Sequence, residues 1–230
     1  MLDKLRELVC RANLRLVEED LVIQTWGNVS GLARDQGLVV IKPSGVSYDG
    51  MTPEQMVVVS LEDGAVVEGD LRPSSDTPTH LALYRAFEGI GGVVHTHSVF
   101  ATAWAQARRD IPALGTTHAD HFYGSIPCTR PMTKAEIEGD YEANTGKVII
   151  ERFEHLDPLQ MPAVLVANHG PFTWGGSADE AVDSSVYLEH IARMASETIR
   201  LNPDAPPIAQ GLLDKHFLRK HGPGKYYGQD

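Results

Sequence analysis

The hydrophobic positions near the start of the chain recur every three or four residues, and polar residues fill the positions between them. This spacing places the apolar side chains on one face of a helix and predicts an amphipathic helix over residues 2 to 19. Short β-branched runs follow at 39–41, 56–60 and 65–67, separated by Gly, Pro and Asp. These runs predict strands of one sheet joined by turns.

Farther along, helical and strand patterns alternate. Capping-box spacing from Thr133 to Glu136 and from Ser177 to Glu180 marks two helix starts. The patterns predict, in order, a helix with Thr77 as N-cap and Pro78 as first residue ending near Phe87, a strand at 92–97, a helix at 98–107, a strand at 163–168, and helices at 178–200 and 208–220. Tight turns between several strands predict an α/β layer fold around a mixed or antiparallel sheet.

Composition narrows the class of protein. Of the 230 residues, 42% are hydrophobic and 22% are charged, which is typical of a globular chain, and no seam or repeat divides it, so residues 1–230 are expected to form a single domain. The net charge of -11 argues against nucleic-acid and anionic-membrane partners, which need an excess of Lys and Arg. Without an apolar run of eighteen residues or a leader pattern, the chain is expected to be cytoplasmic, with Cys10 and Cys128 as small apolar residues.

Three histidines lie where predicted strands end. Residues i and i+2 of a strand project from the same face, so His95 and His97 are expected to lie side by side. The pair alone also fits a structural role. His169 follows the apolar run AVLVAN, and Asp76 directly precedes a predicted helix, and together these four residues predict a site for a divalent transition metal.

A second group of residues is rich in hydrogen-bond donors. Asn28 follows TWG, the segment Lys42 to Gly45 with Ser44 follows a strand, and Ser74 and Ser75 precede a helix. Each segment alone fits an ordinary turn. Together the hydroxyls, the lysine and the free N–H groups of a helix start predict an anion cradle suited to phosphate, although no P-loop motif occurs.

Two further segments carry titratable side chains. Asp120, in TTHADHFY, fits either an acid/base group or a surface loop aspartate. The tail contains Lys225-Tyr226-Tyr227 after two glycines, and aromatic residues there indicate that the tail docks onto something.

Seven segments in one order carry a resemblance that spans nearly the whole chain. They are TWGNVS, IKPSGV, PSSDTPTH, GGVVHTHS, GTTHADHFYG, ANHGPF and the C-terminal LLDKH with LRKHG and YYGQ. By these motifs the chain resembles the class II aldolase/epimerase family, and within it the epimerases that interconvert L-ribulose 5-phosphate and D-xylulose 5-phosphate. The resemblance implies a class II aldolase-like fold with a central, largely antiparallel sheet flanked by helices. It also implies a C4 homotetramer with active sites at subunit interfaces, and Zn²⁺ as the metal, with Mn²⁺ or another divalent ion possible.

Carried over residue by residue, the resemblance assigns roles to matching positions. His95, His97 and His169 would bind the metal and Asp76 would approach it. The phosphate would be held by Asn28, Lys42, Ser44, Gly45, Ser74 and Ser75. Asp120 would be one acid/base and Tyr227, from the tail of a neighbouring subunit, the other, with His216 and Arg219 near the same interface.

Two alternatives remain open at this point. One is a class II sugar-phosphate aldolase such as an L-fuculose-phosphate aldolase, which would use the same metal and release its products; Asp76, Asp120 and the YYGQ tail favour the epimerase. The other is a non-catalytic, adducin-like binding module, against which the three histidines argue. The resemblance fits arabinose and ascorbate routes to the substrate alike.

Overall fold

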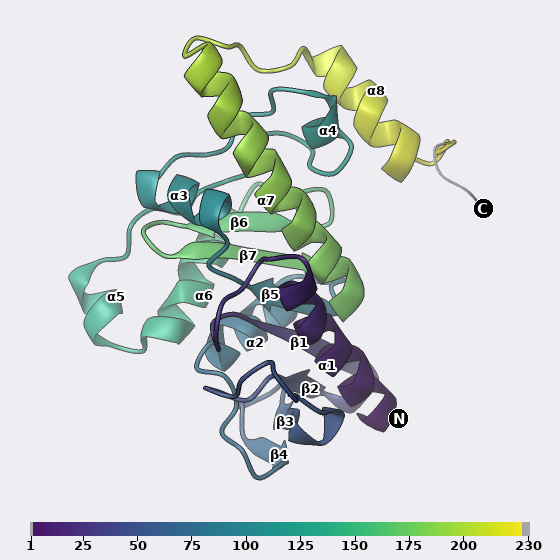
Figure 1. Cartoon of the computed structure of the whole chain (residues 1–230), viewed down its shortest axis with the longest axis vertical. Coiled ribbons are helices and arrows are strands. Elements are labelled where there is room, and N and C mark those ends of the chain that lie inside the picture. Colours follow the sequence, from purple (N-terminus) through teal and green to yellow (C-terminus); the bar gives the residue numbers. More distant parts are fainter. Residues whose placement is uncertain (1, 227–230) are drawn as a thin grey trace.

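The computed structural model describes residues 2–226 and contains one seven-stranded sheet (Figure 1). All neighbouring strands pair antiparallel, in the order β4-β3-β2-β1-β5-β7-β6. The strands are β1 (Asn28–Ala33), β2 (Leu38–Ile41), β3 (Val57–Ser60), β4 (Val66–Glu68), β5 (Gly92–His95), β6 (Ala163–Val166) and β7 (Gly170–Gly175). The sequence patterns predicted a mixed or an antiparallel sheet, and the sheet is antiparallel.

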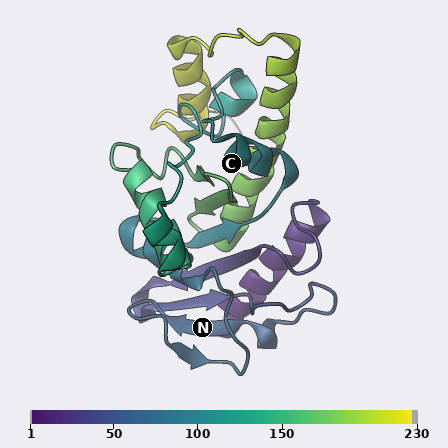
Figure 2. The same cartoon turned by 90° about the vertical axis from the view of Figure 1, so that its left-hand side faces the viewer.

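Helices cover both faces of this sheet. They are α1 (Leu2–Glu18), α2 (Thr77–Ala86), α3 (Val99–Ala107), α4 (Thr116–Ala119), α5 (Lys134–Glu138), α6 (Tyr141–Arg152), α7 (Ala178–Leu201) and α8 (Gln210–His221), with 3-10 turns η1 (Arg34–Gln36) and η2 (Pro53–Gln55). Helices α1 and α7 pack on one face and α2 and α6 contribute to the core on the other. Helices α4 and α8 pack together at the end of the molecule away from β3 and β4 (Figures 1 and 2).

Burial on both faces explains why the central strands are continuous apolar runs. Successive side chains of a strand point to opposite faces. Val39 and Val93 accordingly belong to the core beneath α2 and α6, whereas Val40 and Val94 belong to the core beneath α1 and α7. A strand with both faces covered needs an apolar residue at every position, so alternation of polar and apolar residues disappears.

The sequence patterns located most elements and missed several. The two predicted helix starts are confirmed, since Thr133 caps α5 and Ser177 caps α7 through their side chains. Strands β1 and β7 and helix α6 were not expected. The predicted strand at 92–97 ends at His95, and the one at 163–168 ends at Val166.

The start of α2 differs from the prediction by one residue. Thr77 lies inside the helix, and Asp76 is the N-cap residue, without a hydrogen bond from its side chain to the helix backbone. The Thr77 side chain and N–H instead donate to the carbonyl of Ser74. The Asp76 carboxylate is thereby free to turn toward the sheet.

Two other expectations concern cysteines and membranes. Cys10 and Cys128 are buried and unpaired, as expected of small apolar residues in a core. Across residues 2–226, no helix combines the length and the hydrophobicity needed to cross a bilayer.

Candidate metal centre and active site

The antiparallel pairing brings the predicted site residues together at one end of the central strands. Asn28 begins β1, and Lys42 directly follows β2, which pairs with β1. His95 ends β5, where it lies opposite Asn28 on one side and Phe172 of β7 on the other. His169 lies in the turn between β6 and β7, at the same end of the strands. The chain thus supplies four segments to one point because neighbouring strands run in opposite directions.

The three histidines converge there. The Nε2 atoms of His95 and His97 lie 3.0 Å apart, and one ligand nitrogen from each of His95, His97 and His169 lies within 4.8 Å of the other two. The turn before His169 needs a left-handed backbone, which Asn168 provides with φ of 64°. His97 lies beyond the end of β5, so a regular strand was not required to bring the pair together.

The local environment prepares these imidazoles to act as ligands. His95 Nδ1–H donates to the carbonyl of Pro171 at 2.9 Å, which leaves the Nε2 lone pair free. The Phe172 ring stacks on His95, with 4.2 Å between ring centroids, and holds its plane. Burial lowers the pKa of His97, and burial together with the other two imidazoles lowers the pKa of His169 to about 3. Both side chains are therefore neutral at pH 7, the form that binds metals.

The spacing of the His95 and His97 ring nitrogens also fits a divalent ion. Two ligands about 2.0–2.1 Å from a tetrahedral Zn²⁺ are separated by roughly 3.3 Å. The His95 and His97 nitrogens are 3.0 Å apart, close to that spacing. Three imidazoles leave a fourth position for substrate, so this group could hold a divalent metal in an open site.

Asp76 lies beside the three imidazoles without belonging to that set. Its Oδ2 accepts a hydrogen bond of 2.7 Å from Asn28 Nδ2. Burial by itself raises the pKa of Asp76, but His95, His80 and the Asn28 amide outweigh burial and lower it. The carboxylate is therefore an anion at neutral pH, and its role as a metal ligand stays a prediction.

The predicted phosphate residues belong to two loops that the fold joins. An isolated antiparallel bridge pairs Pro43 with Pro73. Ser74 N–H donates to the Lys42 carbonyl at 3.0 Å, and Ser44 N–H donates to the Arg72 carbonyl at 2.9 Å. Residues thirty positions apart in sequence thus form one structure.

These loops and the histidines line a single cavity of about 420 Å³. The cavity wall includes all the predicted metal and phosphate residues, namely Asn28, Lys42, Ser44, Gly45, Ser74, Ser75, Asp76, His95, His97 and His169. A volume of this size suits a small sugar phosphate.

Lys42 is almost wholly buried at the edge of this cavity. Its ammonium donates to the Val46 carbonyl at 2.8 Å, with the Thr25 and Pro43 carbonyls farther away at 3.4 Å. Burial lowers the pKa of Lys42 to about 8. Lys42 therefore fixes the loop that carries Ser44 and adds a positive charge to the cavity, within an acidic protein.

The cavity residues that were not singled out from the sequence include Trp26, Tyr141 and Glu142. The Tyr141 hydroxyl lies 3.4 Å from His169 Nδ1. Tyr141 and Glu142 begin α6, a helix without a strong apolar pattern, so no local pattern indicated either residue. Trp26 had one usable signal, an aromatic residue inside the donor-rich segment TWGN.

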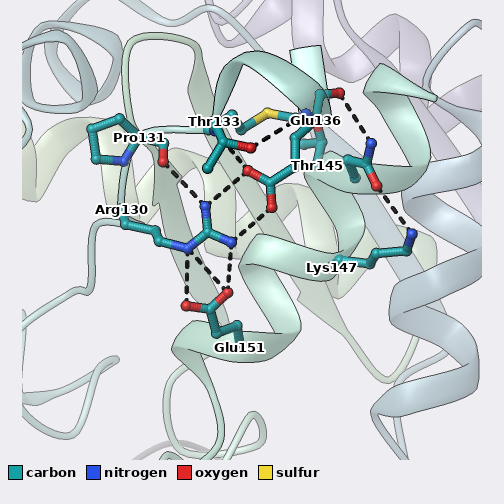
Figure 3. A network of polar contacts seen from close by, with 9 residues as sticks. Arg130, Pro131, Thr133, Glu136, Thr145, Lys147 and Glu151 are labelled. Carbon is teal, nitrogen blue, oxygen red and sulfur yellow. Dashed lines mark hydrogen bonds and ion pairs between the residues drawn. The ribbon is translucent and has the colours of Figure 1, made fainter. Parts of the chain in front are cut away.

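A network of polar contacts joins α5 to α6, the helix that begins with Tyr141 and Glu142 (Figure 3). Arg130 donates to the carboxylate of Glu136 in α5 at 2.8 and 2.9 Å and to that of Glu151 in α6 at 2.8 to 3.1 Å. Asn144 then donates to the Glu136 carbonyl at 3.0 Å. The contacts of Arg130 with the two carboxylates are exposed and individually weak, but the guanidinium joins both helices at once.

Asp120 lies in a different place from the three histidines. It is the C-cap residue of α4, and its carboxylate accepts hydrogen bonds from His216 Nδ1 at 3.0 Å and from Arg219 Nη2 at 2.9 Å, both in α8. Partial burial raises its pKa, but these donors and Lys220 outweigh burial and lower it. Among residues 2–226, the wall of the cavity that contains the three histidines, called the metal cavity below, does not include Asp120, His216 or Arg219. Tyr227 lies outside the described residues.

Comparisons with known proteins agree with this fold. Residues 7–196 match the family model described as class II aldolase and adducin N-terminal domain, and the chain belongs to that family. Within the family, it is 57% identical over 228 residues to the L-ribulose-5-phosphate 4-epimerase UlaF of Salmonella paratyphi A, covering 99% of this chain and all of that protein.

The Salmonella typhi protein of the same name matches equally well. A solved structure of an L-fuculose 1-phosphate aldolase superposes with a TM-score of 0.78 at 25% identity, covering 93% of this chain and 94% of the other. The predicted family and class II aldolase-like fold are thus confirmed.

Proposed function

We propose that this chain is a metal-dependent L-ribulose-5-phosphate 4-epimerase, which interconverts L-ribulose 5-phosphate and D-xylulose 5-phosphate. The observation that carries this proposal is the shared cavity, in which three imidazoles and the two phosphate-type loops, which carry the predicted phosphate residues, face the same space. The similarity to the Salmonella epimerases over the whole chain supports the same activity.

The chemistry explains why such a cavity is needed. A proton on C4 of a 2-ketose is not acidified by the carbonyl, so direct deprotonation is unfavourable. Instead a base takes the proton of the C4 hydroxyl, the C3–C4 bond breaks, and its electron pair stays on the C3 side as an enediolate of dihydroxyacetone. Glycolaldehyde phosphate is the other fragment. After it turns over, C3 attacks the opposite face of the aldehyde, whose oxygen takes a proton.

Separate groups of residues would hold the metal and the phosphate. His95, His97 and His169 would hold the metal, and a divalent ion there supplies Lewis acidity toward the substrate oxygens, worth several kcal/mol. We propose zinc as that ion. Ser44, Gly45, Ser74 and Ser75 would grip the phosphate. Asn28 would hold Asp76 in place through its amide.

Acid/base groups are needed on both faces of the turning aldehyde, and we assign Asp120 and Tyr227 to this task. Asp120 does not line the metal cavity of its own chain. This separation supports a C4 homotetramer in which active sites form between subunits and the cluster of Asp120, His216 and Arg219 meets a neighbouring cavity. The C-terminal tail would bring Tyr227 to the same place.

Measuring both possible reactions tests the assignment. Incubation of the protein with L-ribulose 5-phosphate should give D-xylulose 5-phosphate faster than free glycolaldehyde phosphate. Faster release of the free aldehyde would instead support a sugar-phosphate aldolase, the function of the structural relative. Protein purified without chelators should contain close to one divalent metal per chain, and absence of metal would favour an adducin-like binding module.

Replacement of Lys42 by methionine is expected to raise KM for the sugar phosphate roughly 10- to 100-fold, the effect of losing one charged hydrogen-bonding group. Because an anion favours protonated lysine, the affinity of the wild-type protein should fall as pH rises above about 8, the pKa of Lys42. The variant should lose that decline. KM measured from pH 6.5 to 9.5 checks both points, and a decline of equal size in the variant would contradict the role of Lys42.

A further inference from the structure

Trp26 is the tryptophan whose side chain faces solvent, and it does so in the wall of the metal cavity. The chain has three tryptophans, and Trp26 is 50% exposed, whereas Trp104 is 6% and Trp174 only 1% exposed. A large aromatic group exposed at a cavity is typical of a surface that contacts a ligand.

The backbone that carries this indole is held from the core. The buried Tyr48 places its hydroxyl 2.8 Å from the Trp26 carbonyl oxygen and 2.9 Å from that of Gly27, and donates to them. Gly27 has φ of 77° and leaves no room for a side chain, since a Cβ atom there would lie 2.7 Å from Val22 Cγ1 and 3.0 Å from the His95 carbonyl oxygen. The buried Tyr48 and the close packing around Gly27 therefore hold the turn that exposes Trp26.

This turn places the indole next to the histidines and in the same cavity as the phosphate-type loops. The Trp26 ring lies 6.0 Å from the His97 ring, centroid to centroid, at an interplanar angle of 50°. Asn28, two residues later, lines the same cavity near the phosphate-type loops. A substrate that spans the metal group and these loops therefore passes beside the indole.

The proposed epimerisation needs such a wall for a specific reason. The aldehyde fragment must turn over between bond cleavage and re-addition, and it must not leave the cavity meanwhile. A wall of polar side chains would bind one orientation of the fragment by hydrogen bonds. A flat apolar face contacts either orientation and excludes the water that would carry the fragment away.

Building on the proposed function, we propose that Trp26 is a specificity-determining residue whose indole forms the wall against which the aldehyde fragment turns. It thereby sets the ratio between re-addition, which completes epimerisation, and release of glycolaldehyde phosphate. In this role Trp26 takes no proton and binds no metal.

The test compares that ratio in Trp26→Ala, Trp26→Phe and a matched control, Ile23→Ala. Ile23 is 61% exposed in the same segment and does not line the cavity. The ratio of released aldehyde to epimer should rise roughly tenfold in Trp26→Ala, comparable to losing a small apolar contact in a pocket, and less in Trp26→Phe, which keeps a ring. Metal content should stay unchanged in all three proteins, and Ile23→Ala should match the wild type.

A binding measurement keeps the proposal testable if Trp26→Ala fails to fold. Because Trp26 is the exposed indole, acrylamide should quench its fluorescence, and saturating glycolaldehyde phosphate should reduce the quenching at least twofold in the wild type. Quenching that the aldehyde phosphate leaves unchanged would overturn the proposal. A ratio of released aldehyde to epimer that equals the wild-type ratio in both Trp26 variants would also overturn it, whether or not the oligomeric state changes. If the wild type forms no epimer, the proposed function fails instead.

Discussion

Replacing His95 by asparagine is expected to abolish metal binding and to lower epimerase activity about a thousandfold or more, since Lewis-acid stabilisation is worth several kcal/mol. His95 has the central position in the metal group, between His97 at 3.0 Å and the Phe172 ring that holds its plane. Asparagine removes the Nε2 ligand atom, while its side-chain amide can still donate to the Pro171 carbonyl in place of Nδ1–H. Metal analysis of the purified variant, with the rate of D-xylulose 5-phosphate formation, provides the measurement.

The matched control for this variant is His155→Asn, which changes an exposed imidazole that does not line the cavity. It should keep both metal and activity. If His95→Asn lowers thermal stability while its metal content stays at the wild-type level, then His95 is a structural residue and the metal assignment is wrong.

Replacing Asp120 by asparagine should lower the epimerisation rate about a hundredfold to ten-thousandfold, the range expected for loss of an acid/base group. The metal content should not change, because Asp120 lies outside the wall of the cavity that holds the three histidines. The combination of a full metal site with a large loss of rate distinguishes a proton-transfer role from a metal-binding one. Steady-state kinetics and metal analysis of the same preparation measure both quantities.

Asp120 also has a structural task that the experiment must separate from catalysis. Its carboxylate accepts hydrogen bonds from His216 and Arg219, so asparagine weakens the attachment of α8 to α4. Sizing of the variant reports whether assembly survives, and the exposed Asp204→Asn serves as a control for charge. An Asp120→Asn protein that assembles normally and epimerises at the wild-type rate would exclude the acid/base assignment.

Local signals explain which parts of the fold could be predicted. Helices α1 and α7 have apolar faces, and Thr133 and Ser177 are caps that act within a few residues of themselves. Strands β1 and β7 had no such signal. The run NVSGLA mixes polar and small residues because its face toward α2 carries Ser30, which bonds to His80 and Tyr84 rather than packing as an apolar group. That preference depends on partners fifty residues away, which no local pattern contains.

The candidate site was predictable to a similar degree. The residue types of a metal group and an anion cradle were visible in the chain, each as a separate short segment. Their proximity was not visible, because it depends on antiparallel pairing that sets Asn28 opposite His95 and His95 opposite Phe172. The bridge between Pro43 and Pro73 likewise joins two loops that are far apart in the sequence.

The sequence by itself determined the chemical inventory of this protein: the imidazoles, the hydroxyls and lysine, the capped helices, and a family resemblance carried by ordered motifs. The tertiary structure decided which of these groups share a cavity and which do not. It gathered the histidines with the phosphate-type loops, added Trp26, Tyr141 and Glu142, and placed Asp120 with α8 instead. The physical reason is that side-chain chemistry is local to a residue, whereas proximity arises from strand pairing and helix packing between distant segments.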